Sequence, residues 1–131
     1  MSDESKFNVE KQIAYWRDGA LASWDDALYL LKGKRVMLDM FAVHLALEKA
    51  VKAHVVKQTG KMPPKIHNLT RLAEITKLDL DIERKQILAE INEFNIEGRY
   101  SDTLPAPITL TESKFYVRRA KGTLEWLISL L

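Results

Sequence analysis

Residues 35–59 read RVMLDMFAVHLALEKAVKAHVVKQT, and this stretch decides the fold. Its first half, residues 36–47, is apolar almost all the way round a helix, which is typical of a helix buried on every side. Small residues recur at every fourth position, where a neighbouring helix can approach closely: Ala42, Ala46 and Ala50. Gly60 and the two prolines that follow end the pattern. We therefore expect a central helix over residues 35–59.

Four further segments carry helical periodicity. Residues 9–31 place apolar side chains at steps of three and four, with Gly33 as the stop. Asn68 can cap a short third helix, and the aspartates at 79 and 81 favour a fourth, which we expect to end near Gly98. Thr109 and Glu112 have the spacing of a capping box before the last helix. The sequence predicts an all-α protein, an antiparallel up-and-down bundle of about five helices.

Length and composition favour one compact domain. The 131 residues suit a single domain over 1–131, with a core at 9–100 and a C-terminal helix at 110–130. The 20 basic and 18 acidic residues give a net charge of only +2, a weak signal for nucleic-acid binding. No cysteine is present, which excludes disulfides and thiolate chemistry. The polar N-terminus lacks a secretory pattern and no apolar run reaches ~20 residues, so we expect a cytoplasmic protein with no membrane segment.

One stretch of the central helix resembles a known family. Residues 41–53 read FAVHLALEKAVKA and are similar to the hallmark helix of HEPN domains, with an alanine-leucine-glutamate-lysine core and a second lysine three residues on. The resemblance spans residues 15–102 in order. It includes a tryptophan-containing first helix with paired aspartates, two prolines followed by a histidine, and an arginine-tyrosine-serine exit: Asp25, Asp26, Pro63, Pro64, His67, Leu69, Leu72, Arg99, Tyr100 and Ser101.

The resemblance implies a compact helical bundle, usually a homodimer, and the apolar run at 36–47 is consistent with a dimer. Many prokaryotic HEPN proteins are encoded beside a minimal nucleotidyltransferase and act with it as a toxin–antitoxin pair. Many others are metal-independent RNases with an arginine and a histidine four to six residues apart. Here Arg35 precedes His44 with eight residues between them, and Arg71 follows His67. The RNase pair therefore does not carry over, and the resemblance implies the bundle, the dimer and a nucleotide-linked partner.

The first candidate ligand-binding residues lie on the central helix. Glu48 and Lys52 have the i, i+4 spacing of a helical ion pair, with Lys49 beside them. One interpretation is a pair on a solvated face. The other is a charged patch that contacts a nucleotide phosphate or a partner subunit.

Further candidates follow the central helix. Lys65 and His67 lie on a proline-stiffened loop before Asn68, and His67 can bind a phosphate or act as an acid–base group. Alternatively, His67 orients the loop through a bond to backbone. Arg99 and Tyr100 can clamp an anion and stack a base, or cap a helix end.

The remaining histidines and basic residues have simpler explanations. His44 lies in the apolar part of the central helix and is expected to be a core residue bonded to a carboxylate or carbonyl, whereas His54 is expected to be more exposed. Dispersed histidines give no metal-site spacing, and no cofactor motif is present. The last helix is locally basic, either as a solvated face or as an RNA contact: Lys114, Arg118, Arg119 and Lys121.

Two functions are compatible with these features, and a purely structural bundle is a third. The first is a nucleotide-associated binding module, a homodimer that partners a minimal nucleotidyltransferase, with Glu48, Lys52, His67 and Arg99 lining a groove. The second is an RNase toxin with a non-standard pairing of His67 with Arg71 or Arg99. The missing arginine–histidine spacing favours binding over catalysis, with His67 and Arg99 as the catalytic candidates of the second function.

Overall fold

The computed structural model describes residues 7–95 and 108–131, and within these ranges every regular element is a helix. The elements in chain order are α1 (Val9–Lys32), α2 (Val36–Thr59), α3 (Leu69–Thr76), α4 (Ile82–Ile91), the 3₁₀ helix η2 (Asn92–Phe94) and α5 (Leu110–Ser129). The predicted all-α helix bundle is confirmed. Arg99 and Tyr100, predicted as site residues, lie outside the described residues.

Local sequence signals set the helix ends. Asn8 caps the start of α1, because its side chain accepts a hydrogen bond from the backbone N–H of Lys11. Gly60 ends α2 with a φ of 70°, in the left-handed region that glycine adopts without strain. At α5, Thr109 and Glu112 form the predicted capping box in both directions.

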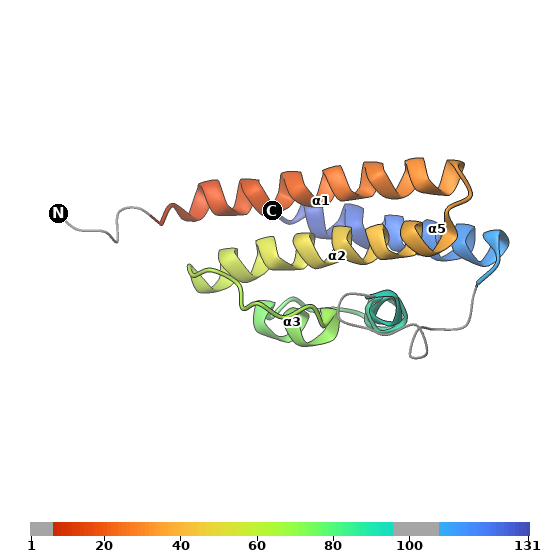
Figure 1. Cartoon of the computed structure of the whole chain (residues 1–131). Helices are drawn as coiled ribbons and strands as arrows, with labels where there is room; N and C mark the ends of the chain where they lie inside the picture. Colours follow the sequence, from red (N-terminus) through yellow and green to blue (C-terminus); the bar gives the residue numbers. More distant parts are fainter. Residues whose placement is uncertain (1–6, 96–107) are drawn as a thin grey trace.

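Helices α1 and α2 form an antiparallel hairpin, with α1 along one side of the molecule and α2 in its middle (Figure 1). Ala20 and Ala27 of α1 and Ala46 and Ala50 of α2 are completely buried. Small side chains on both helices let the backbones approach closely over several turns. This close packing buries one face of α2 along most of its length.

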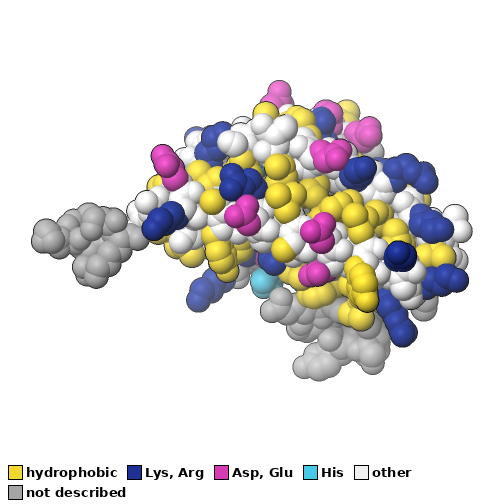
Figure 2. Space-filling model, turned by 90° about the horizontal axis from the view of Figure 1, so that it is seen from above, with side chains coloured by type: hydrophobic (Ala, Val, Ile, Leu, Met, Phe, Trp, Pro, Cys, Tyr) yellow, Lys and Arg dark blue, Asp and Glu magenta, His cyan; other side chains and the backbone are white. Residues whose placement is uncertain are grey.

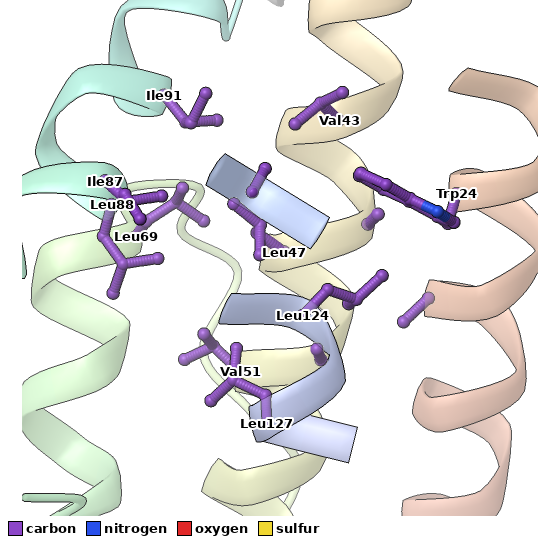
Figure 3. Close-up of a cluster of buried hydrophobic side chains, with 14 of the residues drawn as sticks. Trp24, Val43, Leu47, Val51, Leu69, Ile87, Leu88, Ile91, Leu124 and Leu127 are labelled. Carbon is purple, nitrogen blue, oxygen red and sulfur yellow. The ribbon is translucent and has the colours of Figure 1, made fainter. Parts of the chain in front are cut away.

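The other faces of α2 are covered by the rest of the chain. In Figure 3, Leu47 and Val51 of α2 lie between Trp24 of α1 and the side chains of α3 and α4, with Leu124 and Leu127 of α5 packed against them. The predicted central, most buried helix is confirmed. The chain's own helices bury most of the apolar run at 36–47, so this run offers little surface to a second copy.

Helix α5 runs in the same direction as α2. Near their first turns, Ser113 Oγ donates to Asp39 Oδ2 at 2.6 Å. Near their last turns, Nε2 of His54 donates to the carbonyl oxygen of Leu127 at 2.7 Å. Helix α5 therefore begins beside the start of α2, and it is antiparallel to α1 and parallel to α2 (Figure 1).

Helices α3 and α4 form the opposite side of the bundle. The Asn68 side chain caps α3 as predicted, by accepting from the backbone of Arg71 at 3.0 Å. Helix α4 ends at Ile91 and tightens into η2, earlier than the predicted end near Gly98. The change coincides with a side-chain bond, because Asn92 Oδ1 accepts from the backbone N–H of Leu69 at 2.7 Å. Ile91 and Phe94 are buried.

The outer face of the hairpin carries both charges and apolar side chains (Figure 2). Tyr15, Leu21, Leu28 and Tyr29 of α1 are exposed. Across residues 7–95 and 108–131, none of the helices combines the length and the apolar character needed to cross a bilayer.

Candidate functional site

Glu48 and Lys52 form a buried ion pair in the middle of α2. Lys52 Nζ donates to Glu48 Oε2 at 2.8 Å, and Lys52 and Glu48 are only 6% and 5% exposed respectively. The solvated-face interpretation is therefore wrong. Helix α1 provides the cover: the Lys52 ammonium lies 5.4 Å from the centre of the Trp16 ring. A cation against an aromatic ring is stabilised by the ring's quadrupole.

His67 joins this pair from the segment between α2 and α3. Its Nδ1 donates to the same Glu48 oxygen, Oε2, at 2.9 Å. This bond to a buried carboxylate was not among the interpretations that the sequence offered for His67. The His67 side chain is 39% exposed, so it connects the buried pair to the surface.

His44 completes what we call the Glu48 cluster: His44, Glu48, Lys52 and His67. Nδ1 of His44 lies 3.6 Å from Glu48 Oε1, and the His44 side chain is fully buried. The burial of His44 is confirmed, while its 3.6 Å approach to Glu48 is longer than the hydrogen bond that was predicted. Three nitrogen-bearing side chains thus surround one carboxylate.

Burying a carboxylate and an ammonium group is energetically expensive. The attraction between the two charges offsets the loss of hydration only when the geometry is good and further hydrogen bonds are made. The Lys52 and His67 contacts supply both conditions at Glu48. Such an arrangement fixes the orientation of the His67 ring.

A polar cleft of about 430 Å³ opens at His67, and we call it the His67 cleft. It is lined by His67, Asn68, Ala89, Asn92, Glu93 and Asn95. Two of its amides are held in place, because Asn92 Nδ2 donates to Asn68 Oδ1 at 3.2 Å while both side chains bond to the backbone of α3. The wall is therefore rigid, and its amide and imidazole groups suit a small polar ligand.

Comparison with known proteins decides the family. The model of the HEPN domain matches residues 13–130. This chain belongs to the HEPN domain family. A comparison with curated proteins found no match.

Two solved structures share the fold of this HEPN protein. TT1696 from Thermus thermophilus superposes with a TM-score of 0.79 at 20% identity, over 92% of this chain and 98% of that one. ST0689, an archaeal HEPN homologue, superposes with a TM-score of 0.69 at 17% identity, over 90% and 96% of the two chains. At these identities the likeness establishes the fold.

Helix α2 contains the stretch that resembles the hallmark helix of HEPN domains, and its charged residues separate in space. Glu48 and Lys52 lie behind the His67 cleft instead of lining a groove as predicted. Lys49 faces α1, where its Nζ donates to Ser23 Oγ at 2.9 Å. Lys65 is exposed two residues before His67. The structure therefore groups Glu48, Lys52 and His67, and sets Lys49 apart.

Other predicted residues serve the packing of the HEPN bundle. His54 is 4% exposed, not exposed as predicted, because α5 covers it. Burial lowers the pKa of His54 below its ordinary value of 6.5, although its bond to Leu127 opposes this shift. Arg119 is paired with Glu90 of α4, whereas Arg71 and Arg118 are exposed.

Three side chains that form buried polar or cation–π contacts were not predicted from the sequence to do so: Trp16, Ser23 and Asp39. The contact of Trp16 with Lys52 depends on how α1 packs against α2. Ser23 has no pattern that marks it. Asp39 has a signal, since an aspartate inside an apolar run points to a buried polar group. It is fully buried, and burial raises the pKa of Asp39 from 3.8 to about 6 despite the bond from Ser113. Among the described residues no three side chains of the metal-binding types are grouped to hold an ion.

Proposed function

We propose that this HEPN domain is a nucleotide-associated binding and interaction module, with the His67 cleft as its ligand site. The observation that carries the proposal is the bond from His67 Nδ1 to Glu48 Oε2. A buried charge cluster that holds one half-exposed histidine at the mouth of a polar cleft is more than packing requires. Desolvated charges with specific partners gather at functional sites.

The chemistry of the cleft fits a nucleotide. The Oδ1 atom of Asn68 is engaged within the protein, and its Nδ2 can donate to an acceptor on the edge of a base. Imidazole binds phosphate when it is protonated, and the exposed Lys65 lies two residues away along the chain. In this proposal Glu48 and Lys52 are positioning residues, and His67, Asn68 and Lys65 contact the ligand. Arg99 and Tyr100, which follow Asn95 by a few residues, remain candidates for the phosphate and the base.

Isothermal titration calorimetry with AMP, GMP and ATP tests this site. We expect His67→Ala to weaken binding at least ~10-fold, about 1.4 kcal/mol. Lys85→Ala, which removes an exposed cation of α4, serves as the control and should bind within about two-fold of the unmodified protein. Equal binding by His67→Ala, or no binding of any of the three nucleotides at millimolar concentration, contradicts the proposal.

We also propose that the protein partners a minimal nucleotidyltransferase in a toxin–antitoxin pair. Membership of the HEPN family supports this proposal, since pairing of that kind is common in the family. Co-expression with a minimal nucleotidyltransferase from the same genome tests it. A stable complex in size-exclusion chromatography is the expected result, and separate elution at micromolar concentration contradicts it.

A homodimer is the proposed assembly, and its support lies on α1 and α5. Leu21 and Leu28 of α1 are exposed. Leu21 also lines an apolar groove of about 290 Å³ between the two helices, together with Trp24, Leu124 and Ile128. Sedimentation should give a dimer at micromolar concentration, and Leu21→Glu with Leu28→Glu should give a monomer. A monomer before substitution contradicts the assembly.

A metal-independent RNase is the second candidate function. One observation favours it: a carboxylate that holds Nδ1 of a histidine assigns the acid–base role to Nε2, as in other hydrolytic sites. The absent arginine–histidine spacing places it second. RNA cleavage in the presence of a chelator, lost in His67→Ala, makes catalysis the primary function, and intact RNA excludes it.

A further inference from the structure

A cluster of basic side chains lies at one end of the bundle, away from the His67 cleft. The turn between α1 and α2 brings three of them, and the first turns of α5 bring two more. We call this set the basic end: Lys32, Lys34, Arg35, Lys114 and Arg118. All five residues are exposed, and none forms an ion pair with any residue that the structure describes.

The parallel packing of α2 and α5 brings the two groups together. The bond from Ser113 to Asp39 joins the first turn of α5 to the first turn of α2. Lys114 follows Ser113 directly, and Arg35 lies one turn before Asp39. Figure 2 shows dark blue side chains gathered at the right-hand end of the molecule, where Figure 1 places the α1–α2 turn and the start of α5.

The acidic side chains nearest to the basic end in sequence, Asp39 and Glu112, form no ion pair with its cations. Asp39 is fully buried, and its carboxyl group accepts from Ser113. The Glu112 carboxylate is engaged with the backbone N–H of Thr109 in the capping box. A concentration of positive charge is therefore left facing solvent, although the whole chain has a net charge of only +2.

An exposed aromatic ring lies among these cations. Tyr29 is 79% exposed, the most exposed large apolar or aromatic side chain that the structure describes. With Lys32 and Arg35 it lines an open hollow of about 550 Å³ at the turn, together with Leu30 and Gly33. An aromatic ring beside basic side chains is the arrangement on which proteins stack one base of a single strand while the cations track its phosphates.

We propose that the basic end binds single-stranded nucleic acid, with one base stacked on Tyr29 and the flanking phosphates on Lys32, Arg35 and the cations of α5. This surface is separate from the proposed nucleotide site. Arg35 and Glu48 are separated by about 20 Å along α2, at a rise of ~1.5 Å per residue. Neither proposal therefore depends on the other.

Fluorescence anisotropy with labelled oligo(U), oligo(A) and oligo(dT) of about 12 nucleotides at low salt tests this surface. We expect all three to bind the full chain, since stacking and phosphate contacts do not read the 2′-hydroxyl. Tyr29→Ala should weaken binding about 5- to 100-fold, the range for removal of one stacked base. Lys32→Ala with Arg35→Ala should lower the slope of log affinity against log salt by about 0.7 for each phosphate that these side chains no longer neutralise.

Two controls make the result specific. Lys61→Ala with Lys85→Ala removes two exposed cations far from the basic end and should leave affinity within about two-fold. His67→Ala should also bind the oligonucleotides normally, which separates this surface from the His67 cleft. No binding at low salt overturns the proposal. Equal decreases in affinity for the two double variants also overturn it. So does binding to anionic phosphatidylserine vesicles that is weakened by Lys32→Ala with Arg35→Ala and unchanged by Tyr29→Ala.

Discussion

Oε2 of Glu48 lies 2.9 Å from Nδ1 of His67, so the middle of α2 holds the segment that leads into α3. The same oxygen accepts from Lys52 one turn later on α2. A single buried atom thus connects the hallmark helix of the family to the cleft that we propose as its ligand site. The relationship makes the stability of the bundle and the geometry of the cleft dependent on one carboxylate.

Removal of the Glu48 charge should destabilise the protein more than removal of the whole pair. Glu48→Gln leaves the buried Lys52 without a counter-charge, and a loss of ~3–5 kcal/mol in the free energy of unfolding is expected. Glu48→Gln combined with Lys52→Met replaces the ammonium with an apolar side chain of similar shape and should recover part of that loss. Urea unfolding measures both. A loss below about 1 kcal/mol for Glu48→Gln disagrees with a desolvated pair.

Asp39 should make the protein more stable as the pH falls through 6. Its pKa in the folded state is about 6 against 3.8 for the unfolded chain, so the folded state binds the proton more tightly. That contribution is complete below pH 3.8 and is lost as the pH rises through about 6. Between about pH 7.5 and pH 5 the gain should be about 1 kcal/mol.

The Asp39→Asn variant isolates this effect. The amide oxygen still accepts from Ser113, but the group no longer titrates. The difference in unfolding free energy between the unmodified protein and Asp39→Asn should therefore change by about 1 kcal/mol over this pH range. If this difference in unfolding free energy stays constant, Asp39 is ionised in the folded protein at about pH 5 and the prediction is wrong.

His54 should act in the opposite direction. Its folded pKa is lowered by burial, so the stability that depends on its neutral form is present above pH 6.5 and is lost as the pH falls. In His54→Gln the side-chain amide can still donate to the carbonyl of Leu127 and does not titrate. Between about pH 7.5 and pH 5.5 the melting temperature of the variant should therefore change in the stabilising direction relative to that of the unmodified protein, and identical pH effects contradict the burial.

The absence of a side chain at Gly19 should leave the room that the Lys49 side chain occupies. A Cβ at position 19 would lie 3.2 Å from Lys49 Cδ, while Lys49 Nζ is bound to Ser23. Gly19→Ala gains helix propensity of ~1 kcal/mol but pushes against this tethered side chain. We expect the full gain in a Lys49→Ala background and a smaller one with Lys49 present. Equal gains in both backgrounds, measured by urea unfolding, show that Lys49 yields freely.

The helices were predictable because their signals are local. The periodicity of residues 9–31, the left-handed Gly60 and the pair of Thr109 and Glu112 each define a boundary within one or two turns of chain. The early end of α4 was not predictable in this way. It coincides with a bond between Asn92 and Leu69, which lie 23 residues apart in the sequence.

The sequence identified Glu48 and Lys52 as a pair, but it did not predict that the pair is buried. An i, i+4 pair such as Glu48 and Lys52 has the same sequence pattern on a solvated face and in a core. What distinguishes the two is the Trp16 ring, which α1 places over Lys52. His54 was misjudged for a similar reason, because its cover comes from α5 running parallel to α2. Both errors concern packing between helices that no local pattern records.

The most direct test of the proposed function is to follow the ring resonances of the three histidines by two-dimensional ¹H–¹³C NMR during titration with AMP, GMP and ATP. Each signal can be assigned by replacing one histidine at a time and noting which signal disappears. Since His44 and His54 are buried and His67 opens to the cleft, a bound nucleotide should shift the His67 signals with a saturable dependence and leave those of His54 in place. Nucleotide binding that leaves the His67 signals unmoved, or no shift at saturating concentration, contradicts a ligand site at this histidine.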